Sequence, residues 1–156
     1  MESLEKEQRG TGYKSAKIFS NGQVIDGIGG GICQISSTLY NAALYANLEI
    51  TERRNHQFVT SYLKAGLDAT VVYGSQDFKF KNTRKYPIKI VSEVSNGTAK
   101  INIFGVREET EYDIKIQSTI VQSNSSSIKS VTYKYKYLDG NEISKEIISR
   151  DTYKRQ

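Results

Sequence analysis

Residues 29–44 read GGGICQISSTLYNAAL, and the rest of the chain is organised around this stretch. Three consecutive glycines let the backbone turn sharply and let other groups approach it closely. Beyond them, apolar residues recur at spacings of four, three and four, which is one face of an α-helix: Ile35, Leu39, Ala42 and Ala46. The pattern predicts a helix over residues 33–47 that begins directly after a glycine-rich bend.

The only cysteine of the chain, Cys33, falls in the first turn of this predicted helix. Unpaired backbone N–H groups and the positive end of the helix dipole favour a thiolate at such a position, as a nucleophile requires. An unpaired cysteine is also one of the most commonly buried residue types, so Cys33 is equally well read as a small packing residue. Both readings stay open at the level of sequence.

Composition bounds the class of protein. The chain has 156 residues, of which 37% are hydrophobic and 25% charged, values typical of a soluble globular domain. Eleven tyrosines and a single proline favour β-structure. The net charge of +5 favours anionic partners. No apolar run reaches the roughly 18 residues that a membrane-spanning helix needs, so we expect no span in this chain.

The sequence contains no motif for binding zinc, nucleotides or nucleic acids. One cysteine and one histidine do not suffice for a zinc site of the Cys/His kind. The glycine run lacks the P-loop and G-x-G-x-x-G patterns of nucleotide-binding loops. No helix-turn-helix, RNP-like or zinc-finger pattern indicates nucleic acid. We therefore expect no metal, no cofactor and no nucleic-acid partner.

Alternating apolar and polar residues predict strands on both sides of the helix. The turn signals Asn21-Gly22 and Asn96-Gly97 predict two hairpins. The strands expected before residue 107 are 13–20, 23–25, 48–53, 58–63, 69–73, 78–81, 87–94 and 98–106. The pair 58–63 and 69–73 is expected to form a hairpin through a turn at 64–67.

A second β-rich region follows residue 107. Strands are predicted at 112–121, 130–137 and 142–148, with a serine-rich loop at 123–127, a turn at Asp139-Gly140 and a polar tail at 151–156. We predict an α+β fold in which one main helix packs on a mostly antiparallel sheet. A core domain (1–107) is followed by a β-rich extension (108–156).

The only histidine, His56, lies near the start of a predicted strand. A cysteine at a helix N-terminus with a histidine on a neighbouring strand and a carboxylate or amide on the next is the arrangement of papain-like and transglutaminase-like enzymes. A lone histidine is more commonly structural or on the surface. In the predicted hairpin His56 lies opposite residues 74–76, which makes Asp77 the first candidate to orient the imidazole. Asp68, nearer the turn, is the second candidate and is also placed to cap that turn.

The motif around Cys33 resembles the core of the VanW-like family. The matching residues are 27–42 (GIGGGICQISSTLYNA), and further matches are Glu52-Arg53, His56, Asp68-Ala69 and residues 77–82 (DFKFKN). The resemblance spans residues 9 to 105, and a looser one covers residues 137–153. It implies an envelope-associated bacterial protein, typically Gram-positive, named after accessory genes of glycopeptide-resistance clusters. Longer members often carry an N-terminal membrane anchor and further domains. The segment that usually precedes Gly12-Tyr13 is missing here, so we expect either a trimmed sequence or a short member of the family.

Two classes of function are carried forward. The first is a cysteine-dependent enzyme that acts on an amide, peptide or isopeptide bond of peptidoglycan or of a wall-linked protein. Cys33 is its nucleophile, His56 its general base, Asp77 or Asp68 its orienting carboxylate, and backbone N–H groups near Cys33 and Gln34 its oxyanion donors. The second is a non-catalytic wall-binding or scaffold module whose basic residues meet an anionic wall polymer. A thiol used for covalent attachment or redox sensing is a third reading.

Overall fold

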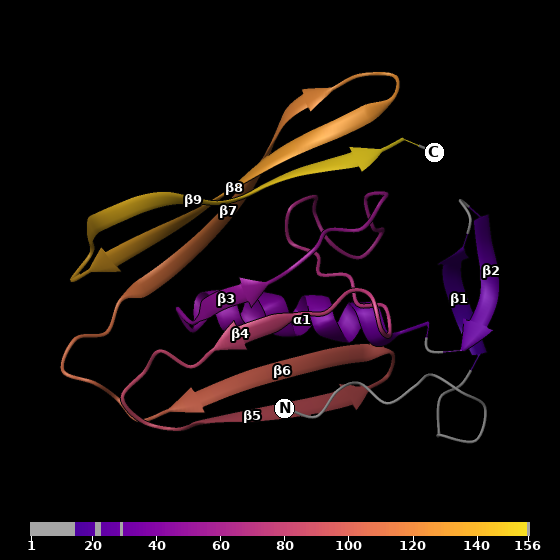
Figure 1. The fold of residues 1–156 in the computed structure, drawn as a ribbon. Helices are drawn as coiled ribbons and strands as arrows, with labels where there is room; N and C mark the ends of the chain where they lie inside the picture. Colours follow the sequence, from indigo (N-terminus) through magenta and orange to yellow (C-terminus); the bar gives the residue numbers. More distant parts are fainter. Residues whose placement is uncertain (1–14, 21–22, 29, 156) are drawn as a thin grey trace.

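The computed structural model describes residues 15–20, 23–28 and 30–155, and these contain one helix and nine strands (Figure 1). In chain order the elements are β1 (Ser15–Ser20), β2 (Gln23–Ile28), α1 (Ile32–Tyr45), β3 (Glu49–Glu52), β4 (Lys79–Lys81), β5 (Ile88–Ser95), β6 (Thr98–Gly105), β7 (Asp113–Ser123), β8 (Ser127–Leu138) and β9 (Asn141–Lys154).

All the paired strands are antiparallel, and they form four separate sheets. Three are two-stranded, β1–β2, β3–β4 and β5–β6, and the fourth is the three-stranded sheet β7–β8–β9. The predicted α+β class is therefore confirmed, whereas the prediction of one sheet under the helix is wrong. Apart from β3 and β4, each described strand pairs with its neighbour in sequence through a short turn. No pairing between described strands joins the four sheets into one.

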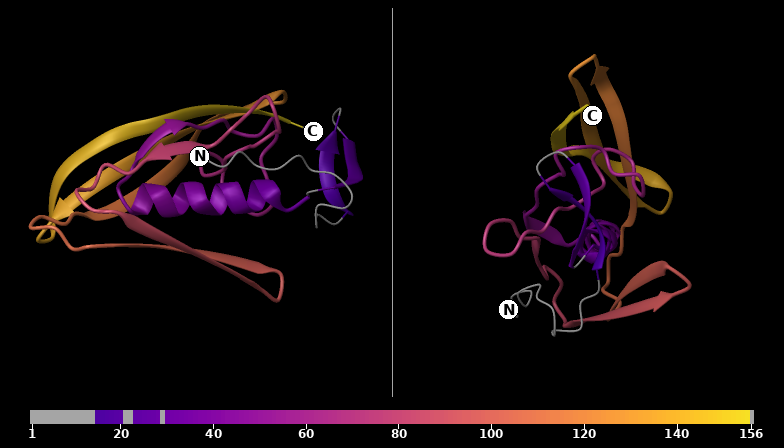
Figure 2. Two further views of the ribbon diagram at one scale, coloured as in Figure 1. Left: turned by 60° about the horizontal axis from the view of Figure 1, so that its bottom comes forward. Right: turned by 90° about the vertical axis from the view of Figure 1, so that its right-hand side faces the viewer.

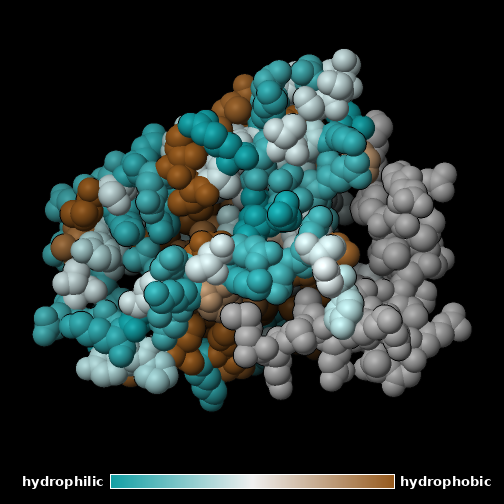
Figure 3. Space-filling model, in the orientation of Figure 1, coloured by the Kyte–Doolittle hydropathy of each residue, from teal (hydrophilic) through white to brown (hydrophobic). Residues whose placement is uncertain are grey.

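The helix α1 lies in the middle of the molecule, between the β7–β9 sheet and the β5–β6 hairpin (Figures 1 and 2). Its buried face contributes Tyr40 and Leu44, which form a core cluster with Ala69. Four partly buried apolar residues from other segments pack against that cluster: Ile50, Phe78, Ile116 and Ile148. Elsewhere on the face seen in Figure 3, apolar side chains form separate patches between polar ones.

The predicted helix and most predicted hairpins are confirmed to within a few residues. The turns Asn96-Gly97 and Asp139-Gly140 have all four residues at positive φ, between 49° and 80°, as two-residue hairpin turns require. Asn21-Gly22 lies outside the described residues, although Ser20 pairs with Gln23 across it. The boundary predicted at residue 107 falls in the connection between β6 and β7.

The strands predicted at 58–63 and 69–73 are absent, since residues 53–78 form an irregular segment with only two isolated β-bridges, Phe58 with Lys154 and Val72 with Gln76. Its backbone groups are bonded by other partners. Carbonyls of residues 67–71 accept from side chains of α1, and backbone groups around His56 bond to β9. Around residues 67–71, side-chain donors take the place of the backbone hydrogen bonds between strands that the alternating pattern predicted.

The C-terminal residues were expected to form a polar tail, and this is wrong as well. β9 continues to Lys154, with Asp151 paired to Ser130 and Tyr153 paired to Ile128. Tyr153 is fully buried and Asp151 is 7% exposed. The burial pattern alternates along the strand because Asp151 and Tyr153 share the face that packs against residues 53–68.

Gly66 packs tightly against the β7–β9 sheet. Its φ is +92°, and a Cβ built on it meets Thr132 Oγ1 at 2.4 Å and Ser118 Oγ at 2.7 Å. Ser118 donates to the Ala65 carbonyl, and Thr132 Oγ1 donates to the Gly66 carbonyl at 3.3 Å. Only glycine lets the backbone sit this close to the sheet at this φ.

Replacing Gly66 by alanine is therefore expected to lower the free energy of unfolding by more than about 2 kcal/mol, because positive-φ strain and steric overlap add. Gly74→Ala is the matched control: φ is +76° there, but nothing lies within 4 Å of the added Cβ. It should cost about 1 kcal/mol. Urea unfolding measures both, and equal losses would show that the contact at Gly66 is not tight.

Candidate catalytic site

Cys33 is the second residue of α1, directly after the glycine bend. The N–H groups of Gln34 and Ile35 both donate to the Gly31 carbonyl, at 3.1 and 3.2 Å. The Gln34 N–H, predicted to be an oxyanion donor, is thus already engaged within the first turn. Its side chain is exposed. The N–H of Cys33 itself lies one residue closer to the positive end of the helix, where donors have no acceptor within the helix.

A ladder of side-chain hydrogen bonds fixes α1 against residues 67–71. Asn41 Nδ2 donates to the Leu67 carbonyl at 2.7 Å, Ser36 Oγ donates to the Ala69 carbonyl at 2.6 Å, and the Cys33 sulfur lies 3.6 Å from the Val71 carbonyl oxygen. Ser37 Oγ also accepts from the Ala69 N–H at 2.9 Å.

His56 is held by Asp68. His56 Nδ1 lies 2.7 Å from Asp68 Oδ2, and the His56 backbone N–H donates to the same oxygen at 2.7 Å. The imidazole is 17% exposed and the carboxylate 1% exposed. With Nδ1 bonded to the carboxylate, Nε2 is the ring nitrogen not engaged by Asp68, and the Cys33 sulfur is close enough to interact with the imidazole.

Asp77, the first candidate to orient the imidazole, lies elsewhere. Its Oδ1 accepts from the Phe78 N–H at 2.8 Å, and its Oδ2 lies 3.8 Å from Lys79 Nζ. The predicted pairing assumed a regular hairpin from 56 to 77. Because residues 57–67 loop back instead, the carboxylate that reaches His56 is Asp68, the second candidate.

The charges of the site hold His56 protonated. Burial by itself lowers the pKa of the imidazole, but the hydrogen bonds with Asp68 and Cys33 outweigh it and raise the pKa from 6.5 to about 9. Burial also disfavours the charged form of Asp68, and for a carboxyl group this raises the pKa. The bonds from His56 and Tyr153 and the charge of Arg53 overcome that effect, so the pKa lies below its usual range.

Four residues around this site were not predicted to act in it. Arg53 donates from Nε to the Asp68 carbonyl (2.6 Å) and from Nη1 to Asp151 Oδ1 (2.5 Å). The Tyr153 hydroxyl donates to Asp68 Oδ1 at 2.6 Å. The Tyr62 ring makes an edge-on contact with His56, with centroids 6.4 Å apart. One signal was available in the sequence, since Asp151 and Tyr153 are two residues apart and so share a face in any strand.

Burial and the neighbouring Cys33 and Asp68 raise the pKa of Tyr62 to about 12, against a smaller opposing effect of Ser37. Its hydroxyl therefore stays protonated at neutral pH. Tyr62 is 37% exposed and forms part of the rim of the site.

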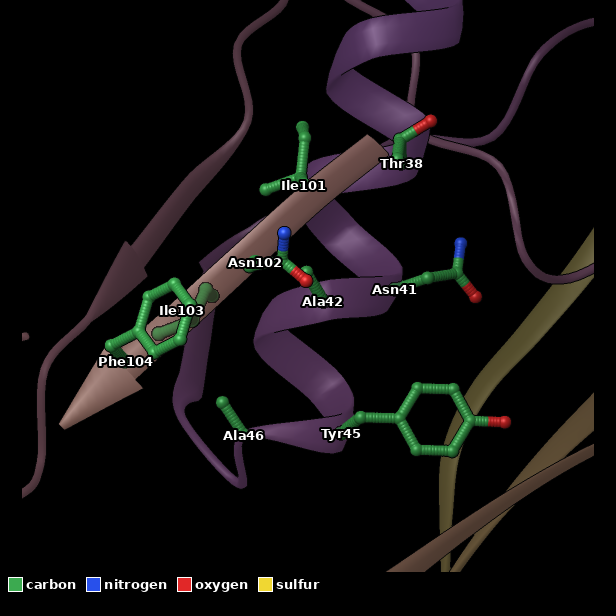
Figure 4. Close-up of a pocket in the computed structure, with 9 residues that line it drawn as sticks. All are labelled: Thr38, Asn41, Ala42, Tyr45, Ala46, Ile101, Asn102, Ile103 and Phe104. Atoms are coloured by element: carbon green, nitrogen blue, oxygen red, sulfur yellow. The ribbon is translucent and has the colours of Figure 1, made fainter. Parts of the chain in front are cut away.

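Two hollows lie away from Cys33. A shallow groove of about 530 Å³ runs between α1 and β6 and is lined by Thr38, Asn41, Ala42, Tyr45, Ala46 and residues 101–104 (Figure 4). A second, of about 520 Å³, separates β3 from β9 and has Arg53 and Asp151 in its wall. Among the described residues, no cluster of His, Cys, Asp and Glu is arranged to hold a metal ion. No described helix has the length and apolar character to cross a bilayer.

Comparison with known proteins gives the family. Residues 1–104 match the family described as VanW like protein, which is two thirds of the chain. The chain belongs to the VanW-like family. A Bacillus subtilis (strain 168) protein, "Uncharacterized protein YoaR", is 44% identical over 96 residues, covering 62% of this chain. The aligned stretch spans 32% of that relative's length. No solved structure shows significant similarity.

The VanW-like match contains Cys33, His56 and Asp68, and ends before β7. Asp151 and Tyr153, which contact Arg53 and Asp68, lie outside it. The resemblance stated from the sequence is thus confirmed at the level of the family. A papain-like or transglutaminase-like arrangement of the whole fold is not confirmed.

Because His56 is the only histidine, its imidazole can be followed by NMR in the intact chain. We expect it to titrate near pH 9 rather than 6.5, since Asp68 and Cys33 favour the charged ring. Asp68→Asn should bring the titration down by at least about one pH unit, because the buried negative charge is lost. Asp77→Asn, the matched control, should leave it unchanged, and a shift in both variants would contradict the assigned pairing.

The raised pKa of His56 also makes stability depend on pH. The folded pKa of about 9 exceeds the unfolded value of 6.5. The contribution of His56 is therefore complete below pH 6.5 and disappears as pH rises through about 9. An upper limit of about 3 to 4 kcal/mol is involved, at roughly 1.4 kcal/mol per pH unit over the ~2.5 units between the two pKa values. The stability difference between wild type and His56→Gln, from denaturant unfolding, should shrink between pH 6 and pH 10; a constant difference would argue against a charged imidazole.

Proposed function

We propose that this VanW-like protein is a cysteine-dependent acyl-transfer enzyme that cleaves or remakes amide bonds in the bacterial envelope. One observation carries the proposal. Cys33 in the first turn of a helix interacts with a histidine whose Nδ1 lies 2.7 Å from a buried carboxylate. Nucleophile, base and orienting group are the three parts that covalent acyl transfer needs.

The reaction runs in two steps. In the first, the Cys33 sulfur, its proton held on His56, attacks the carbonyl carbon of the amide. The C–N bond breaks as His56 gives its proton to the leaving amine, and a thioester remains on Cys33. In the second, a water molecule or an amine attacks the thioester, His56 takes the proton of the nucleophile, and the C–S bond breaks. Asp68 keeps the imidazole oriented through both steps.

The first helical turn supports this chemistry. Negative charge develops on the carbonyl oxygen during both attacks, and the N–H of Cys33 together with the helix dipole stabilises charge at that place. Gln34 N–H contributes only through its bond to Gly31, which shapes the turn. The site contains an edge-on tyrosine, Tyr62, whose protonated hydroxyl offers a donor at the rim.

The substrate is proposed from the family. VanW-like resemblance implies the envelope of Gram-positive bacteria, where peptide and isopeptide bonds of peptidoglycan and wall-linked proteins are the abundant amides. The positive net charge of the chain, +5, suits an anionic wall polymer.

A non-catalytic wall-binding module is the second candidate function. The groove between α1 and β6, of about 530 Å³, supports it because it lies apart from Cys33. The densest basic stretch of the chain consists of Lys79, Lys81, Arg84, Lys85 and Lys89. It supports this function less, since Lys79 bonds Glu52 at 2.7 Å and Arg84 pairs with Glu108 and Glu111. Binding to wall polymer that survives Cys33→Ala and weakens steeply with salt would favour this reading.

Muropeptides released from Gram-positive peptidoglycan test the enzyme directly. After acid quenching, intact-protein mass spectrometry should detect an acyl adduct on wild type and none on Cys33→Ala. His56→Gln should slow product formation by roughly 10²–10⁴-fold, as expected for loss of a general acid–base. Asp77→Asn should act like wild type. Full turnover by Cys33→Ala would end the proposal.

A further inference from the structure

The Asp68 carboxylate has donors on both oxygens. Oδ2 accepts from His56 Nδ1 and from the His56 N–H, both at 2.7 Å. Oδ1 accepts from the Tyr153 hydroxyl at 2.6 Å and lies 3.3 Å from Arg53 Nη2. The carboxylate cannot rotate without giving up bonds at both ends, so the donors at Oδ1 decide where Oδ2 points.

The Tyr153 hydroxyl is itself fixed in direction. The Gly66 N–H, which can only donate, lies 2.6 Å from the hydroxyl oxygen. The single proton of the hydroxyl is therefore directed to Asp68 Oδ1. Burial and the charge of Asp68 raise the pKa of Tyr153, so that this proton is retained. Tyr153 is fully buried, which excludes water as a competing partner.

The strand that carries Tyr153 also holds the backbone around His56. The Lys154 N–H donates to the Gln57 carbonyl at 2.8 Å, and Asn55 Nδ2 donates to the Thr152 carbonyl at 3.0 Å. Thr152 and Lys154 of β9 thus bond the residues just before and just after His56. Tyr153, which lies between them in the strand, bonds Asp68. One strand places both members of the His56–Asp68 pair.

We propose that Tyr153 is a positioning residue: its hydroxyl sets the orientation of the Asp68 carboxylate toward His56, so that the C-terminal sheet completes the site. This inference rests on the proposed function and deepens it. It adds a strand that lies outside the family match over residues 1–104. Arg53, tied to Asp151 on the same face of β9, is the second donor at Oδ1.

Alkylation of Cys33 by iodoacetamide, followed from pH 3 to 10, gives the readout, because the chain has one cysteine. In Tyr153→Phe, Asp68 loses the hydroxyl bond that favours its charged form. The acid limb of the rate profile should move up by about one pH unit, as for loss of a hydrogen bond to a charged group.

Ser118→Ala is the matched control. It removes another anchor of the same turn to the same sheet, the bond from Ser118 to the Ala65 carbonyl, without touching Asp68. The acid limb of this variant should coincide with that of wild type. An equal shift in Ser118→Ala would mean that Tyr153 acts only by general anchoring and would overturn the inference, as would an unmoved acid limb in folded Tyr153→Phe.

Two further variants keep the outcomes separate. Arg53→Lys keeps a positive charge but loses the forked contact with Asp68 and Asp151, so its acid limb should move in the same direction. If Tyr153→Phe does not fold, an unmoved limb in Arg53→Lys overturns the inference. His56→Gln tests the proposed function itself. If the rate profile of His56→Gln equals that of wild type, Cys33 and His56 do not act as a pair and the proposed function is wrong. If the profile of His56→Gln changes but the acid limb of Tyr153→Phe stays in place, only the positioning role of Tyr153 is wrong.

Discussion

The buried carboxylate of Asp68 is the constraint on which the rest of the structure depends. A carboxylate that is 1% exposed is costly unless its oxygens are bonded by donors and its charge is balanced. Here the donors come from three places: Arg53 after β3, His56 in the irregular segment, and Tyr153 on β9. Satisfying one charge therefore draws together parts of the chain that are 85 residues apart.

The second constraint is the hydrogen-bond ladder between α1 and residues 67–71. It explains how a segment without regular secondary structure carries a well-ordered carboxylate. Asn41, Ser36 and Ser37, on one face of the helix, bond successive carbonyl and N–H groups of Leu67 and Ala69. Because the ladder runs to Val71 beside Cys33, the element that presents the sulfur also positions Asp68. Cysteine and carboxylate are thereby set relative to each other by the same helix.

Much of the fold follows from local pattern. The helical spacing after the glycines, the Asn96-Gly97 and Asp139-Gly140 turns and the alternating strands of the C-terminal region each appear where the sequence predicts them. Prediction failed where side chains replaced backbone partners. Residues 58–63 and 69–73 alternate as strands do, yet the donors of α1 and β9 bond their neighbourhood instead. A pattern of apolar residues does not show which donors a segment will meet.

Residue identity and spacing along the chain place Cys33 in the first turn of a helix, make His56 the sole imidazole and identify the chain as VanW-like. The packing of distant segments, by contrast, is what brings Asp68 rather than Asp77 to His56. It also brings Tyr153, which was expected in a polar tail, to the same carboxylate. Pairing in an assumed hairpin depends on register, and one loop that turns back changes every partner. A contact between residues 85 positions apart produces no periodic pattern in the sequence, since it depends on how the hairpins and the helix pack.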